Sequence, residues 1–118
     1  MTKKIKKTVL QSSEDISRTL KNKSTSNSKH LSLYKQLNNL ESSRLGLAIP
    51  RKNAKRAIDR NRIKRLIREN FRNSNESVPY DIVIKLHTPI GKQTRKKLRE
   101  SERKAIRQEV IKFFDKKP

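Results

Sequence analysis

Two stretches of this chain alternate hydrophobic and polar residues, and a third is almost continuously apolar. Leucine recurs with period two between residues 31 and 37, which is typical of a half-buried strand. A second strand is expected over residues 44–49, where apolar residues alternate with small ones. Residues 80–86 are rich in β-branched side chains and are bounded by prolines, which predicts a third strand at the centre of the sheet.

Three other segments have the spacing of helices. A cap-type cluster at residues 12–15 predicts the start of a short first helix, in which Ile16 and Leu20 lie one turn apart. A long helix is expected to end near residue 72, with either Asp59 or Asn53 as its N-cap, and the sequence leaves both starts open. A last helix is expected from about residue 94 to residue 114, with an apolar stripe that packs in the core.

The element order is helix, strand, strand, long helix, strand, helix. This order predicts the α+β class, as a small single-domain sandwich with helices laid against one sheet. We expect residues 1–12 to be a basic, flexible N-terminal segment, residues 13–114 to be the single domain, and residues 115–118 to be a basic tail. The polar stretch 22–29 lacks periodicity and is interpreted as a loop.

The composition narrows the function. The 118 residues contain 32 Lys plus Arg against 11 Asp plus Glu, a formal net charge of +21, which indicates a polyanionic partner. Hydrophobic residues make up only 31%, which allows a thin core and argues against a large enclosed active site. The absence of cysteine excludes zinc fingers and ribbons. No apolar run approaches the roughly 20 residues that span a bilayer. We therefore expect no membrane partner, and we expect a cytoplasmic location.

One side of the long helix is basic and the other is apolar. Projection at about 100° per residue separates the basic side chains from Ile63, Leu66 and Ile67. Guanidinium groups pair bidentately with phosphate, and the basic connector before the helix extends the same patch. The predicted RNA-binding residues are Arg51, Lys52, Lys55, Arg56, Arg60, Asn61, Arg62, Lys64, Arg65 and Arg68. Arg60 projects near the apolar edge, so the alternative that it holds local structure stays open.

The run from Arg60 to Glu69, followed by Phe71 and Arg72, resembles the arginine-asparagine-arginine signature of the bacterial ribonuclease P protein subunit. Segments 44–47, 51–53 and 80–83 reinforce the resemblance, and element order and length agree over residues 13–114. The resemblance implies a parallel strand pair joined by a left-handed βαβ crossover through the signature helix, although most such crossovers are right-handed.

The resemblance also implies a division of labour between protein and RNA. In this family the catalyst is a large RNA, and the protein binds that RNA and the 5′ leader of precursor tRNA. The implied partners are ribonuclease P RNA and precursor tRNA, without DNA, and the holoenzyme uses Mg²⁺ that the protein alone does not bind tightly. The histidines, His30 and His87, are not paired in sequence with a nucleophile, a base or a metal-ligand cluster. We therefore expect no catalytic and no metal-ligating residue, and an inactive protein in the absence of RNA.

The resemblance implies that the leader lies between the first helix and the exposed sheet face. Family members commonly place aromatic side chains there, and Tyr34 is the aromatic that remains in this chain. The predicted leader-binding residues are Ile16, Leu20, Leu31, Tyr34 and Ala48. Aromatic stacking on a base contributes ~1–3 kcal/mol, so weaker or less selective leader binding is expected from the aliphatic residues. Core packing of Ile16 and Leu20, and cross-strand packing of Tyr34, are the alternatives.

Two other functions fit the composition. Structural ribosomal proteins are also small, basic and free of cysteine, but generic basicity does not predict the signature helix. A DNA-binding regulator would lay the basic helix in a major groove, yet it would need an adjacent helix-turn-helix or a dimerisation face. Strands flank the helix instead, so the ribosomal protein is the main alternative.

Overall fold

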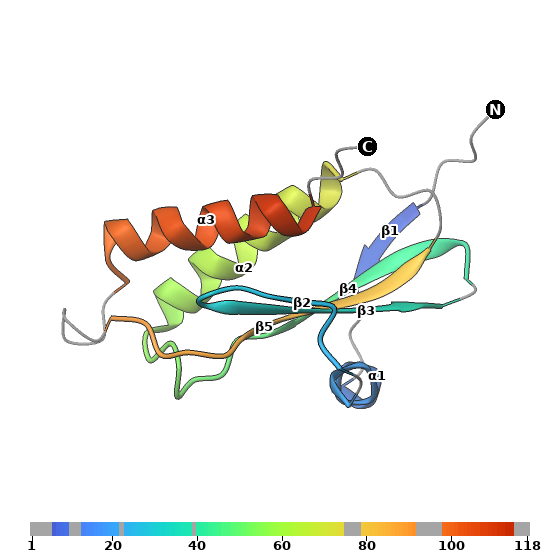
Figure 1. The fold of residues 1–118 in the computed structure, drawn as a ribbon, viewed down its shortest axis with the longest axis horizontal. Helices are drawn as coiled ribbons and strands as arrows, with labels where there is room; N and C mark the ends of the chain where they lie inside the picture. The colour runs from blue at the N-terminus through green and yellow to red at the C-terminus, as the bar shows by residue number, and fades with distance from the viewer. Residues whose placement is uncertain are drawn as a thin grey trace.

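A computed structural model of the chain describes residues 6–9, 13–21, 23–38, 40–74, 79–91 and 98–114. It has the α+β architecture expected from the sequence, with helices on both sides of one open sheet (Figure 1). The elements in order are β1 (Lys6–Val9), α1 (Ser13–Leu20), β2 (Ser26–Asn27), β3 (Leu31–Leu37), β4 (Ser42–Ala48), α2 (Ala57–Arg72), β5 (Tyr80–Leu86) and α3 (Glu100–Phe114).

The five strands form one sheet in the order β1-β4-β5-β3-β2. The β-branched strand β5 lies at its centre, as predicted, antiparallel to β3 and parallel to β4. In the parallel pair Leu45 lies beside Ile82 and Leu47 beside Ile84. Since α2 connects β4 to β5, the expected βαβ unit is present, and the handedness of its crossover stays a prediction.

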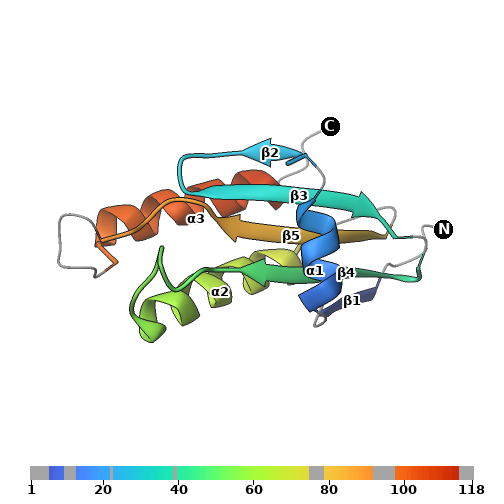
Figure 2. The ribbon, with the colours of Figure 1, turned by 90° about the horizontal axis from the view of Figure 1, so that it is seen from below.

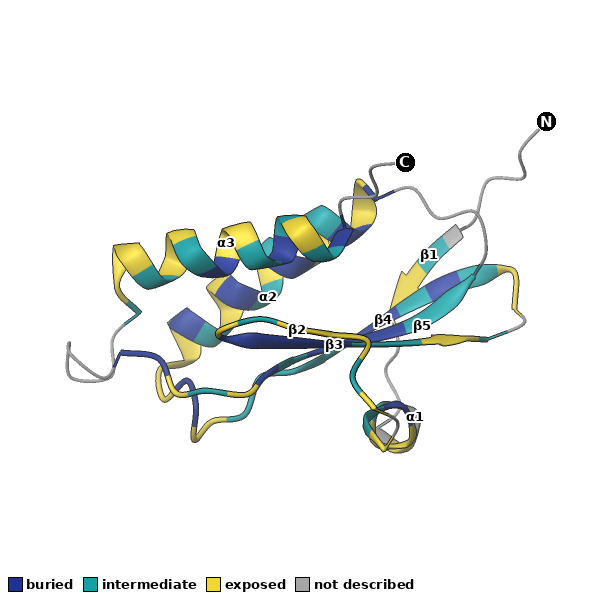
Figure 3. Cartoon of the chain, in the orientation of Figure 1, coloured by how far each residue is buried: buried dark blue, intermediate teal, exposed yellow. Residues whose placement is uncertain are grey.

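Helices α2 and α3 cover one face of the sheet, and α1 crosses the other face below β3, β4 and β5 (Figures 1 and 2). The buried positions of α2 and α3 alternate with exposed ones along each helix (Figure 3). At the C-terminal ends of these helices the rings of Phe71 and Phe114 pack with centroids 6.1 Å apart. The hydrophobic core consists of Leu31, Leu33, Leu45, Ala54, Ile63, Ile67, Phe71, Ile82, Ile84, Leu86, Ile90, Ile106, Val110 and Phe114.

The segment expected to be flexible at residues 1–12 contains a strand, and the loop expected at 22–29 contains another. Residues Lys6–Val9 pair in parallel with β4. Lys7 anchors this strand, because its Nζ donates to the carbonyl of Arg72 at 2.8 Å and to that of Ser74, at the C-terminal end of α2. The four residues are too few and too polar to show a strand period. The expected tail at residues 115–118 lies outside the described residues.

Neither predicted N-cap begins the long helix. The helix starts at Ala57, and Arg56 is the N-cap without a side-chain hydrogen bond. Asp59 is instead buried, and its Oδ2 accepts the backbone N–H of Leu98 at 3.1 Å. Asn53 donates from Nδ2 to the carbonyl of Leu86 at 2.8 Å. Both side chains therefore join α2 and its connector to distant segments, which local sequence does not indicate.

Candidate nucleic-acid interface

Helix α2 presents a basic ridge because its apolar side is packed. Ile63, Ile67 and Phe71 recur at intervals of four residues and are buried against the sheet and α3. The polar side points to solvent, and Lys64 is half-buried. The exposed members of the predicted RNA-binding set on this helix are Asn61, Arg62, Arg65 and Arg68.

Arg60 has a structural role. Its Nη1 donates to the carbonyl of Ala54 at 2.9 Å and to that of Lys55 at 3.1 Å. The guanidinium therefore folds back onto the connector and holds the backbone from which the other predicted cations project. The side chains of that connector that are exposed are Arg51, Lys52, Lys55 and Arg56.

A groove of about 400 Å³ lies between α2, the outer edge of the sheet and α1. Its floor is apolar, and cationic side chains of α2 stand along it. The groove brings Ile16, from the predicted leader-binding set, together with Lys64 and Arg68 of the predicted RNA-binding set. Its lining residues are Lys7, Thr8, Val9, Ile16, Leu45, Leu47, Lys64, Arg68, Phe71 and Arg72. An apolar floor beside cations suits a nucleotide, whose base is flat and whose phosphate is charged.

A second groove lies between α2 and α3 and adds a cation that the sequence did not indicate. It has a volume of about 460 Å³ and is lined by Arg62, Arg65, Leu66, Glu69, Glu100 and Arg103. The guanidinium of Arg103 donates to both oxygens of Glu100, at 3.0 and 2.6 Å. This hydrogen-bonded pair lowers the pKa of the Glu100 carboxyl. Helix α3 thus contributes an Arg103–Glu100 ion pair, with no net charge, to the wall of this groove.

The opposite face of the sheet carries most of the predicted leader-binding residues. Tyr34 lies beside Val83 and Ala48 beside Lys85 in the sheet register. These positions are out of phase with the core residues of β5, so they face α1, where Ile16 and Leu20 are half-buried. Tyr34 and Ala48 are also half-buried. Lys85 adds a cation to this face. The sequence could have indicated this, because Lys85 lies two positions after Val83 and therefore shares its face of the strand.

Leu31 does not belong to that surface. It is 0% exposed and packs in the core between the sheet and the α2 and α3 layer. The alternation of β3 correctly separates Leu31 and Leu33 from Tyr34, but alternation alone does not say which face the two long helices cover. The structure therefore removes Leu31 from the expected leader site.

A partly buried ion pair between Arg44 and Asp81 lies at the polar end of the face covered by α1. Arg44 donates from Nε and Nη2 to the two oxygens of Asp81 at 2.7 and 2.6 Å, and Asn38 donates to Asp81 at 2.9 Å. Partial burial raises the pKa of the Asp81 carboxyl, but the hydrogen bonds from Arg44 and Asn38, with the charge of Arg44, outweigh it. The net result is a lowered pKa. The ionised carboxylate therefore ties β4, β5 and the end of β3 together.

We expect Asp81→Asn to lower the free energy of unfolding at pH 7 by about 1 kcal/mol, the typical net value of such hydrogen bonds. Since the folded-state pKa lies below the ordinary value of 3.8, the contribution is complete well above pH 3.8 and is lost as the pH falls through the folded-state pKa. Urea unfolding of both proteins at pH 7, 5 and 3 measures the effect. A difference between them that stays constant down to pH 3 would contradict this prediction.

The described ranges contain no group of three or more His, Cys, Asp or Glu side chains that could ligate a metal ion. No helix within them is long and apolar enough to cross a membrane. The arrangement as a whole is a cationic, grooved surface around α2. The opposite face of the sheet, which α1 crosses, carries both polar and apolar side chains.

The chain matches known proteins over most of its length. The family model described as Ribonuclease P matches residues 5–110. The ribonuclease P protein component of Haemophilus influenzae (strain PittGG) is 49% identical over 63 residues, covering 52% of this chain and 53% of that protein. The corresponding protein of Vibrio vulnificus (strain YJ016) is 40% identical over 90 residues, covering 75% and 66%. The aligned part thus spans about half to two thirds of these relatives.

Two solved structures share the fold. The RNase P protein of Staphylococcus aureus superimposes with a TM-score of 0.61 at 26% identity, covering 95% of this chain and 100% of that one. The RNase P protein of Thermotoga maritima superimposes with a TM-score of 0.69 at 24% identity, covering 92% and 99%.

Proposed function

This chain belongs to the ribonuclease P protein family, and we propose that it is the protein subunit of a ribonuclease P, an RNA-based endonuclease that removes the 5′ leader of precursor tRNA. In this proposal the protein binds the catalytic RNA through α2 and its connector. It holds the leader on the side of the sheet that α1 crosses. The observation that carries the proposal is the exposed basic ridge of α2 on a packed apolar base.

The groove between α2 and α1 supports a continuous path for RNA. Lys64 and Arg68 stand on its α2 side, and Ile16 contributes from α1. A nucleotide in this groove would contact the predicted leader-binding and RNA-binding sets at once. The leader would then run from Ile16 towards Leu20 and Tyr34, while the catalytic RNA contacts the outer side of the ridge.

The two histidines have structural partners, which supports catalysis by the RNA. His30 binds Glu109 through Nδ1 at 2.6 Å, and the ring of His87 lies 2.8 Å from the carbonyl of Ser28. In this proposal the Mg²⁺ is held by the holoenzyme, where it would supply the electrostatic activation of the attacking water. The protein contributes binding and positioning.

Precursor-tRNA cleavage at low Mg²⁺ tests the proposal. A bacterial ribonuclease P RNA is assayed alone, with this protein, and with a polylysine of equal net charge. We expect this protein to restore release of the 5′ leader, because it screens phosphate repulsion and orients the substrate. Polylysine should not restore correct cleavage, since it lacks the fixed surface. If the protein does not stimulate cleavage, the result would contradict the proposal and favour a ribosomal role.

A further inference from the structure

The groove between α2 and α3 carries acidic side chains within a cationic surface. We call this second groove of the interface the α2–α3 groove. Glu69 lines it from α2, and Glu100 lines it from α3. A carboxylate repels phosphate at short range. These two carboxylates therefore need an explanation other than contact with an RNA backbone.

Glu69 lies in the row of cations that we assign to RNA binding. It follows Arg65 by four residues and Arg62 by seven, so the three side chains share one face of α2. Glu69 is exposed, and the ion pairs among the described residues do not include it. Its two carboxylate oxygens are thus available to accept hydrogen bonds from a ligand in the groove.

The rest of the α2–α3 groove offers surface for a flat, apolar group. Leu66 packs against the core and also lines the groove. Arg103 is engaged with Glu100 through two hydrogen bonds. A guanidinium held in this way can still stack on a base, because stacking uses the face of the plane and not its N–H groups. Such surface beside a carboxylate suits a nucleobase better than a phosphate.

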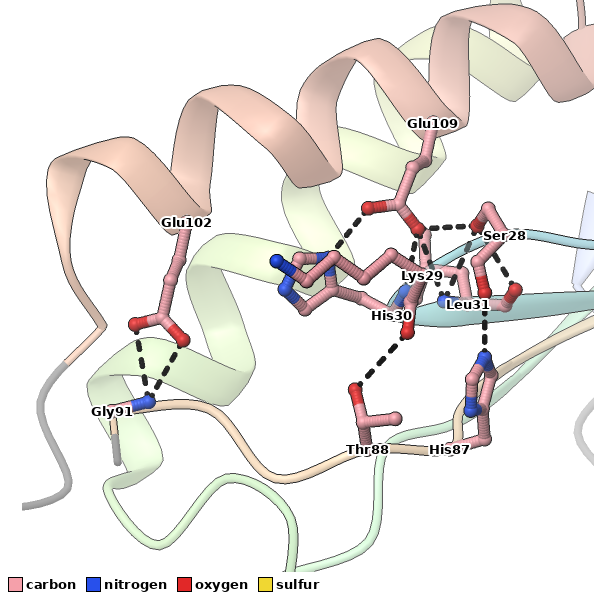
Figure 4. Close-up of polar contacts among 9 residues, drawn as sticks. All are labelled: Ser28, Lys29, His30, Leu31, His87, Thr88, Gly91, Glu102 and Glu109. Atoms are coloured by element: carbon pink, nitrogen blue, oxygen red, sulfur yellow. Dashed lines mark hydrogen bonds and ion pairs between the residues drawn. The ribbon is translucent and has the colours of Figure 1, made fainter. Parts of the chain in front are cut away.

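The α3 wall of the groove is fixed by backbone contacts. The carboxylate of Glu102 accepts the N–H groups of Gly91 and Arg99, each at 3.1 Å, and Figure 4 shows the contact with Gly91. Asp59, in the first turn of α2, accepts the N–H of Leu98 at 3.1 Å. These bonds tie the start of α3 to α2 and to the segment after β5. The groove is therefore formed before a ligand enters, which favours binding.

A carboxylate selects guanine among the four bases of RNA. It accepts hydrogen bonds and donates none. The Watson–Crick edge of guanine presents two adjacent donors, N1–H and the 2-amino group, which match the two oxygens of one carboxylate. Adenine, cytosine and uracil each place an acceptor beside the donor on that edge, and this acceptor would face the carboxylate. The edge is accessible in an unpaired base, which is the form that proteins commonly read in RNA.

We propose that the α2–α3 groove binds an unpaired guanine of ribonuclease P RNA, with N1–H and the 2-amino group donating to the carboxylate of Glu69. The phosphates next to this base contact Arg62 and Arg65. The identity of the RNA rests on the proposed function. Phosphate contacts position a protein, whereas base contacts specify a sequence. Glu69 thus adds base specificity to a surface whose other contacts are to the backbone.

The affinity of Glu69→Gln for ribonuclease P RNA tests the contact. We expect binding about 10-fold weaker, because the amide turns a donor towards one of the two guanine donors. A carboxylate that only repels RNA gives the opposite sign, since the loss of a negative charge would then tighten binding. Glu41→Gln removes the same charge from an exposed position in the turn between β3 and β4 and should not weaken binding. Urea unfolding checks that both variants are folded.

Arg65→Ala, on the α2 ridge, is the positive control for this measurement. If Arg65→Ala weakens binding and Glu69→Gln does not, the guanine proposal is overturned and the proposed function stands. If neither variant weakens binding, the proposed function fails as well. Equal weakening by Glu69→Gln and Glu41→Gln would also overturn the guanine proposal, because the effect would not depend on the groove.

Inosine identifies the base, because it lacks the 2-amino group of guanine. Ribonuclease P RNA is transcribed with inosine scattered over its guanosine positions, and the bound and unbound fractions are separated. With the unchanged protein, inosine should be depleted several-fold from the bound RNA at a guanosine that contacts Glu69. With Glu69→Gln this depletion should disappear, while depletion at guanosines needed for RNA folding should stay. Identical patterns with the two proteins would overturn the contact.

Discussion

Replacing Glu109 with alanine is expected to lower the free energy of unfolding by roughly 3 kcal/mol, because it leaves buried donors without an acceptor. Oε1 of Glu109 accepts the N–H groups of His30 at 2.8 Å and Leu31 at 3.1 Å, and also the hydroxyl of Ser28. Oε2 binds the imidazole of His30. The side chains of His30 and Glu109 are only 7% and 11% exposed. One carboxylate on α3 thus holds the turn that starts β3.

A loss of this size is large for a small domain, whose total stability is typically about 5–15 kcal/mol. Urea unfolding should show a lower midpoint with an unchanged dependence on denaturant. Glu109→Gln keeps an oxygen for the backbone N–H groups and should lose less. Gln108→Ala changes the exposed neighbouring residue and should shift stability by less than about 0.5 kcal/mol. If Glu109→Ala and Gln108→Ala have equal stability, the network does not hold the turn.

Hydrophobic periodicity within a segment correctly predicted the strands and the helix whose buried faces follow from their own sequence. The strands Leu31–Leu37 and Tyr80–Leu86 have the bounds expected from period two and from β-branched residues. The basic and apolar sides of α2 follow from the helical period. β1 was not predicted because its stability comes from distant contacts. It pairs with β4, and Lys7 donates a hydrogen bond to the end of α2, 65 residues away in the sequence. Such distant contacts leave no local pattern.

The same distinction applies to the candidate site. The cations of α2 could be assigned from the helical period because one amphipathic helix contains them. The partners of Glu109 lie 78 to 81 residues away, so its role could not be read from α3 alone. Leu31 and Tyr34 could not both lie on the leader side, because residues three positions apart in a strand point to opposite faces. The structure places Leu31 in the core. The groove that joins Ile16 to Lys64 needs β1, α1, β4 and α2 in place, and no single segment indicates it.

The double replacement Arg62→Ala and Arg65→Ala is expected to weaken binding to ribonuclease P RNA by about 10²- to 10⁴-fold at physiological salt. Hydrogen bonds to charged groups contribute about 1.5–3 kcal/mol each, and two such contacts are lost. The slope of log affinity against log salt should fall by about 1.8, since each phosphate contact contributes up to about 0.9. Both side chains are exposed, so the fold should be retained, and urea unfolding checks this.

The control is a second double variant with the same loss of charge. Arg107→Ala and Lys112→Ala remove two exposed cations from α3 and leave the α2 ridge intact. If the protein binds the RNA through α2, this control should retain nearly full affinity for ribonuclease P RNA. It should also stimulate precursor-tRNA cleavage fully at low Mg²⁺. The α2 variant should give cleavage close to that of the RNA alone, and a higher protein concentration should restore it, because the defect lies in assembly. Equal losses in the two variants would show that net charge alone attracts the RNA, and they would contradict a specific interface on α2.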